Sequence, residues 1–201
     1  MILAIDNGVS GSLALLSTIP GLPPAALVSL PVMRAPLYHR AVSKKKVSGP
    51  KAKKKVKSAF ANEIDAVALK AIIVGFGVSK ITAVVFEDAP EHGDRASTLR
   101  SMAGSAAKIM AVLEILGLAG ITYRIQSHTW QSAMLNDGKK IPTGQTKPLA
   151  VEMARLLCPA QDWRRTPRCE GPDTGHVDAY LIGVWALRHI PGLTSGVRFE
   201  R

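Results

Sequence analysis

Short apolar runs, each bounded by polar or glycine-rich turns, predict five strands along the chain. Residues 1–5 and 12–16 are apolar and are joined by the turn NGVSG, which is typical of a β-hairpin. Further strands are expected at 25–31, 81–86 and 121–125. The run at 81–86 is rich in β-branched and apolar residues, which favours a buried central strand.

Helical spacing of apolar residues begins after Asn62, which is a plausible N-cap. One face of this first helix carries Ile64, Val67, Ala68, Ala71, Ile72 and Phe76. Further helices are expected at 97–116, 146–157 and 177–189, with a short one opening at Thr129 and Trp130. The order β-β-β-α-β-α-β-α-α predicts an α/β fold, in which a three-stranded antiparallel meander leads into parallel strands.

The composition narrows the class of protein. A chain of 201 residues that is 47% hydrophobic is expected to form a single domain, 1–201. Cys158 and Cys169 make neither a disulfide framework nor a zinc pattern, so a reducing, intracellular compartment is expected. Neither a signal peptide nor an apolar run of spanning length is visible, which predicts a soluble protein that is not secreted and does not enter the membrane.

The charge points to an acidic partner. The formal net charge is +11 and the pI about 10.0, which favours nucleic acid first and an anionic membrane second. Eight lysines and no acidic residue lie between positions 44 and 57. We interpret 34–58 as a lysine-rich flexible insert that contacts DNA phosphates; a solvated tail or a nuclear-localisation-like patch is the alternative.

Acidic residues stand at the ends of two predicted strands. Asp6 follows the first strand, Glu87 follows the fourth, and Asp178 lies at the start of the last helix. The ends of these strands can be neighbours in the sheet, and the helix can lay its first turn across them. Three converging carboxylates would repel one another without a cation, so they predict a site for hard divalent cations. For Asp6 taken alone, a turn aspartate that caps the backbone near Gly8 is an equal alternative.

Five motifs resemble the RuvC family of Holliday-junction resolvases, and the likeness is closest to the phage and organellar branches. They are DNGVSGSLA from Asp6, VVFE ending at Glu87, TWQ around Trp130, Thr146-Lys147, and HVDAYLIG around Asp178. The resemblance implies an RNase H-like fold, a mixed five-stranded sheet flanked by helices. It also implies a homodimer that cleaves branched DNA, the four-way junction, with two Mg²⁺ or Mn²⁺ ions in each active site.

Carried over by position, the resemblance assigns metal binding to Asp6, Glu87 and Asp178. The family usually has an Asp or His three to five residues before the last acid, and the position three before Asp178 is Gly175. The candidates for the fourth ligand are Asp173 and His176. We favour Asp173, because hard cations prefer carboxylate oxygen; His176 is equally well explained as a capping or core histidine.

Basic residues around these acids are candidates for DNA contact. Lys147 either contacts the scissile phosphate or is a surface lysine, and Trp130 is interpreted as a core anchor in preference to a base-stacking residue. Arg95 and Arg100 lie where the family meets the junction arms. The remaining candidates for phosphate binding are Lys44, Lys45, Lys46, Lys53, Lys54, Lys55, Lys139 and Lys140.

Two other functions are weighed against a structure-selective endonuclease. A non-catalytic protein that binds junctions or other DNA is suggested by Gly175, where an acid is expected. An actin-like or sugar-kinase-type phosphotransferase is suggested by the opening strand, but the length allows one lobe of a fold that needs two. The small residues of 97–116 offer either a self-association face or ordinary core packing.

Overall fold

A computed structural model describes residues 1–19, 22–36, 60–88, 96–142 and 144–193, and the structural statements that follow concern these residues. The strands are β1 (Ile2–Ile5), β2 (Ser12–Leu16), β3 (Ala26–Ser29), β4 (Val32–Pro36), β5 (Phe60–Ile64), β6 (Ala83–Glu87) and β7 (Thr122–Ile125). The helices are α1 (Ala66–Phe76), α2 (Ala96–Ile115), α3 (Ser127–Leu135), α4 (Thr146–Leu157) and α5 (Thr174–His189). Short 3-10 turns occupy Val78–Lys80 and Ala119–Ile121.

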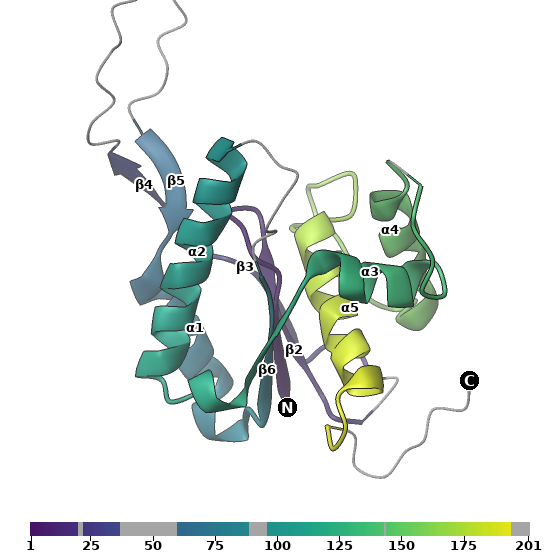
Figure 1. Ribbon diagram of the computed structural model, residues 1–201, viewed down its shortest axis with the longest axis horizontal. Helices are drawn as coiled ribbons and strands as arrows, with labels where there is room; N and C mark the ends of the chain where they lie inside the picture. Colours follow the sequence, from purple (N-terminus) through teal and green to yellow (C-terminus); the bar gives the residue numbers. More distant parts are fainter. Residues whose placement is uncertain (20–21, 37–59, 89–95, 143, 194–201) are drawn as a thin grey trace, which may run out of the picture.

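The main sheet has five strands in the order β3-β2-β1-β6-β7. Strands β1, β2 and β3 are antiparallel neighbours, whereas β6 and β7 run parallel to β1. The helices lie on both sides of this sheet (Figure 1). The RNase H-like fold class predicted from the sequence, a mixed five-stranded sheet flanked by helices, is thus confirmed.

Alternation along the strands divides the core into two layers. Leu3 and Ile5 of β1 pack with α1 and α2, whereas Ile2 and Ala4 pack with α3, α4 and α5. Strand β6 alternates in the same way, with Val84 on the first side and Val85 on the second. Because side chains alternate with a period of two, residues 6 and 87 continue the row that faces α5.

Helix α5 comes unusually close to the sheet because its inner face is built from small residues. Gly175, Ala179 and Gly183 recur every four residues, which places them on one side of the helix. A Cβ atom on Gly183 would lie 2.5 Å from Leu16 Cδ1, and one on Gly175 would lie 2.5 Å from the Ser10 carbonyl oxygen. This close packing fixes the height of α5 above the first hairpin.

Three sequence-based boundaries were wrong. Residues 34–36 belong to β4, and Asn62 and Ile64 belong to β5, which pairs with β4 in a separate two-stranded ribbon. The first helix starts at Ala66 instead, capped by Asp65, whose Oδ1 accepts from the backbone N–H groups of Val67 and Ala68. Helix α5 starts at Thr174, three residues earlier than expected, so Asp178 lies in its second turn.

The rest of the predicted insert, 37–59, lies outside the described residues, and its assignment stays a prediction. Among the helices of the described ranges, none has both the length and the apolar character needed to cross a membrane.

The close approach of α5 yields the first testable prediction. Gly175→Ala should lower the free energy of unfolding by roughly 1–3 kcal/mol, because the added methyl group meets backbone at Ser10 and not a flexible side chain. The matched control is Gly104→Ala, an exposed α2 position with open space around the added carbon. It should raise stability by up to about 1 kcal/mol through helix propensity. Chemical denaturation measures both; equal effects of the two substitutions would contradict the packing argument.

Candidate metal centre

Asp6 and Glu87 lie side by side at the carboxyl ends of neighbouring parallel strands. Ile5 pairs with Phe86 in the register of β1 and β6, so the next residue of each strand is one of the two acids. The Asp6 backbone N–H donates to the Ser12 carbonyl oxygen at 3.0 Å, which keeps this strand end within the β1–β2 hairpin. Both carboxylates belong to the row that faces α5.

Asp178 completes the group from the helix above. Burial raises the pKa of Asp178 to about 7, although the nearby Lys147 charge acts in the opposite direction. Burial also raises the pKa of Glu87 to about 7, with a further upward contribution from Asp178. The pKa of Asp6 is raised well above its usual value, first by burial and then by the charges of Glu87, Asp178 and Asp173. The four acids therefore share one electrostatic environment.

Three acids of this group have no salt-bridge partner among the described residues. Within the described ranges, no lysine or arginine forms a salt bridge with Asp6, Glu87 or Asp178. The same residues contain no set of three His, Cys, Asp or Glu side chains close enough to hold one ion as they stand. Carboxylate oxygens are nevertheless the donors that Mg²⁺ and Mn²⁺ prefer, so the donor set fits these ions.

Glu87 has a buried hydrogen-bond donor. The Trp130 indole Nε1 donates to Glu87 Oε2 at 2.9 Å, and this bond lowers the pKa of Glu87 against the effect of burial. Trp130 is fully buried in the α5-side core. Trp130 is therefore not accessible for stacking on a base. It is a core residue, as interpreted from the sequence, and it also donates a hydrogen bond to Glu87.

Asp173 lies beside the space that a side chain at position 175 would enter. A Cβ atom on Gly175 would lie 3.2 Å from Asp173 Oδ1 and 3.0 Å from Ser12 Oγ. Asp173 also caps α5, since its Oδ1 accepts from the His176 backbone N–H at 3.2 Å. Its other oxygen pairs with Arg165 Nε at 2.5 Å. The carboxylate thus reaches the edge of the acid group but is held there by Arg165.

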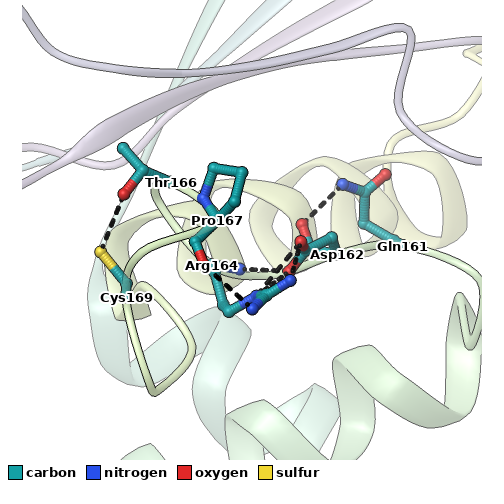
Figure 2. A network of polar contacts seen from close by, with 6 residues as sticks. All are labelled: Gln161, Asp162, Arg164, Thr166, Pro167 and Cys169. Carbon is teal, nitrogen blue, oxygen red and sulfur yellow. Dashed lines mark hydrogen bonds and ion pairs between the residues drawn. The ribbon is translucent and has the colours of Figure 1, made fainter.

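Arg165 is not among the site residues predicted from the sequence. Figure 2 shows that polar contacts among its own residues stabilise the loop before Asp173. Arg164 pairs with Asp162 through Nη2 and Oδ2 at 2.8 Å and donates to the Pro167 carbonyl oxygen at 3.2 Å. Thr166 Oγ1 and Cys169 Sγ are 3.3 Å apart. These local contacts hold the segment from which Arg165 meets Asp173, and no sequence motif indicates that pairing.

His176 resembles a core histidine more than a ligand. It is buried, its Nε2 lies 3.3 Å from Ser29 Oγ, and burial lowers its pKa. It is therefore a neutral ring whose Nε2 has a hydroxyl partner on β3. These contacts favour Asp173 over His176 as the fourth ligand. The charge of Asp173 also raises the pKa of Asp6.

The predicted basic residues are distributed unevenly around the acids. Lys147 is exposed at the start of α4 and acts electrostatically on Asp178, so the structure brings these two together. Lys139 and Lys140 are exposed in the turn after α3. Arg100 lines a cavity of about 350 Å³ between β5 and α2 with Glu63 and Lys108. Arg95 and the lysines Lys44, Lys45, Lys46, Lys53, Lys54 and Lys55 lie outside the described residues.

Comparisons with known proteins gave similarity to solved structures only. No family model matches the chain, and no curated protein matches it. The chain is similar to a structure of Thermus thermophilus RuvC at 12% identity and a TM-score of 0.41, over 93% of this chain and 95% of that one. It is also similar to T. thermophilus RuvC in complex with a Holliday junction substrate, at 11% identity and a TM-score of 0.45, over 93% and 94%. The functional assignment consequently depends on the carboxylate geometry.

The raised pKa values predict how stability depends on pH. Between the usual values, 4.5 for Glu87 and 3.8 for Asp178, and the folded values of about 7, the folded state keeps protons that the unfolded state has released. The free energy of unfolding of the metal-free protein should therefore fall as the pH rises through this window, and Asp6, whose pKa is also raised, should add to the fall. Thermal denaturation in EDTA at pH 5 and pH 8 measures the difference.

Two variants test the origin of that dependence. Asp178→Asn should reduce the difference between pH 5 and pH 8, because an amide does not titrate. Asp162→Asn is the matched control, since Arg164 lowers the pKa of Asp162 to about 2 and keeps its titration outside the window. A pH dependence that is unchanged by Asp178→Asn would show that other groups cause it.

Proposed function

We propose that this chain is a metal-dependent endonuclease that resolves four-way DNA junctions. One observation carries the proposal: the buried Glu87 of β6 and two half-buried carboxylates, Asp6 after β1 and Asp178 of α5, share one electrostatic environment without a salt-bridge partner in the described ranges. Structural carboxylates in a protein interior are normally paired. Unpaired acids that meet at strand ends are instead suited to holding divalent cations.

The proposed site uses Asp6, Glu87, Asp178 and Asp173 to hold two Mg²⁺ or Mn²⁺ ions. Such ions activate a water molecule for attack on a phosphodiester and stabilise the leaving oxygen. Asp6 and Glu87 form a rigid base for the site, because both are fixed by the register of β1 and β6. We assign contact with the scissile phosphate to the Lys147 ammonium group, which is exposed and acts electrostatically on Asp178.

The choice of branched DNA comes from the charge and the motif resemblance together. A formal net charge of +11 favours a polyanion, and the five motifs resemble those of junction resolvases. Symmetric cleavage of a four-way junction needs two active sites, so we propose a homodimer. Helix α2 offers a face for it, because Ala103, Gly104 and Ala107 are exposed on its surface.

Cleavage of an immobile four-way junction, compared with a linear duplex of the same sequence, tests the proposal. Paired nicks are expected in the junction only, with Mg²⁺ or Mn²⁺ and not with EDTA. Asp6→Asn, Glu87→Gln and Asp178→Asn should each lower the cleavage rate at least about a thousandfold, which is about 4 kcal/mol of transition-state stabilisation. Junction binding should remain, because these substitutions remove negative charge. Loss of binding together with cleavage would contradict the assigned roles.

A non-catalytic junction-binding protein is the second candidate function. Gly175 and the Arg165 contact of Asp173 favour it, because together they leave the fourth acid without freedom to turn inward. Equal binding in EDTA and in Mn²⁺, with no nick in either, would establish this alternative.

The fourth ligand can be tested by a pair of variants. Asp173→Asn should lower cleavage strongly at fixed Mg²⁺ concentration, since it removes the charge while asparagine still caps α5. His176→Gln should keep most of the activity, because the ring contacts Ser29 and is buried away from a cationic role. Cleavage rates as a function of Mg²⁺ concentration distinguish the two; the reverse order of effects would make His176 the ligand.

A further inference from the structure

Trp130 and Glu87 form a buried pair that the proposed chemistry does not by itself require. The indole N–H to Oε2 distance is 2.9 Å, Trp130 is 0% exposed and Glu87 is 8% exposed. An indole can only donate a hydrogen bond, so it pairs with a carboxylate oxygen that serves as an acceptor. This contact therefore holds Oε2, whereas Oε1 accepts no hydrogen bond from the part of the chain that the structure describes.

The short connection from β7 to α3 brings the Trp130 indole to Glu87. Glu87, the last residue of β6, is in register with Ile125, the last residue of β7. Helix α3 starts two residues later, and its fourth residue is Trp130. One helical turn after leaving the sheet, the chain thus presents the indole to the end of the neighbouring strand. The link joins residues 43 positions apart.

Packing fixes the orientation of the donor. Trp130 belongs to the core cluster that also holds Met134 of α3, Ala150 of α4 and Ala179 of α5. A ring that is enclosed by three helices has no room to turn, so its N–H points in one direction. Hydrogen-bonded partners of this kind orient metal ligands, and their removal typically weakens metal binding 10–100-fold.

We propose that Trp130 is a positioning residue for the metal centre, whose indole N–H locks the Glu87 carboxylate so that Oε1 binds the cation. The inference rests on the proposed function. It assigns to the tryptophan of the Thr129-Trp130-Gln131 motif a role in ion affinity instead of DNA contact.

The chain contains a matched control for the loss of the indole. Trp163 is also buried, at 4% exposed, and belongs to the same core cluster. Its ring packs on Tyr180 with centroids 5.0 Å apart, and its Nε1 has no hydrogen-bond partner within the described part of the chain. Trp130→Phe and Trp163→Phe remove the same atoms from the same core, but only the first removes a bond to a carboxylate.

Titration of the DNA-free protein with Mn²⁺ alone, followed by electron paramagnetic resonance, tests the inference. Trp130→Phe should raise the Kd for Mn²⁺ about 10–100-fold. Trp163→Phe should leave the Kd within about threefold of the wild type, even where it lowers the thermal midpoint as much. An unchanged Mn²⁺ affinity in Trp130→Phe would overturn the positioning role. Absence of saturable Mn²⁺ binding in the wild-type protein would instead overturn the proposed metal centre, and this inference with it.

A second measurement covers the case in which Trp130→Phe does not fold. The chain has three tryptophans, so Trp163→Phe and Trp185→Phe leave Trp130 alone. Biosynthetic replacement of that tryptophan by its benzothienyl analogue keeps the ring shape and exchanges the N–H for sulfur. The same 10–100-fold rise in Kd is expected; equal Mn²⁺ affinity with tryptophan and analogue would overturn the inference.

Discussion

The close approach of helix α5 to the first hairpin is the constraint on which the candidate site depends. Asp178 acts on Glu87 and Asp6 only because the helix rests almost directly on β1 and β2. Small residues at 175, 179 and 183 make that contact possible, and larger ones would lift the helix from the sheet. The packing that stabilises the fold thereby forces like charges together in a poorly solvated place, where they raise one another's pKa.

The same packing explains how the fourth acid is arranged. A side chain at position 175 would collide with the hairpin, so an acid cannot occupy that position without moving Ser10. The Asp173 carboxylate lies instead at the edge of that space, two residues earlier and outside the helix proper. There it also has to cap α5, and Arg165 compensates its charge. The Asp173 carboxylate thus has two roles, since it caps α5 and belongs to the acid group. The other three acids do not share the capping role.

Sequence patterns predicted the parts of the site that follow from local periodicity. Apolar runs ending on Asp6 and Glu87 identified two strand ends, and the parallel pairing of β1 and β6 confirms that they are neighbours. The ribbon of β4 and β5 escaped prediction because its partners flank the lysine-rich segment and Asn62 also suits a helix cap. The start of α5 was placed too late because Thr174 and Gly175 are weak helix formers.

Contacts that depend on how distant segments pair could not be predicted from the sequence. The bond from Trp130 to Glu87 requires the pairing of β6 with β7, which has no local signal, although the short helix around Trp130 was expected. The salt bridge of Arg165 with Asp173 depends on a loop braced by its own polar contacts. In both contacts a charged group meets a partner that only the tertiary fold brings near. Asp6 and Glu87, in contrast, could be predicted because they stand at the ends of apolar strands.

The opposite signs of the site and its surroundings imply an order of events for the proposed nuclease. Burial raises the pKa of Asp178 to about 7 although the Lys147 charge acts in the opposite direction, and no salt bridge pairs Asp6, Glu87 or Asp178 within the described residues. A phosphodiester that enters such a site meets uncompensated negative charge and is repelled. Bound cations reverse the sign at the place where the phosphate must lie, while the basic surface supplies attraction at longer range. Metal and DNA should then each increase the affinity of the protein for the other, because linkage between two ligands is reciprocal. The buried acids would in this way couple DNA binding near the reacting phosphate to the presence of the ions needed to cut it.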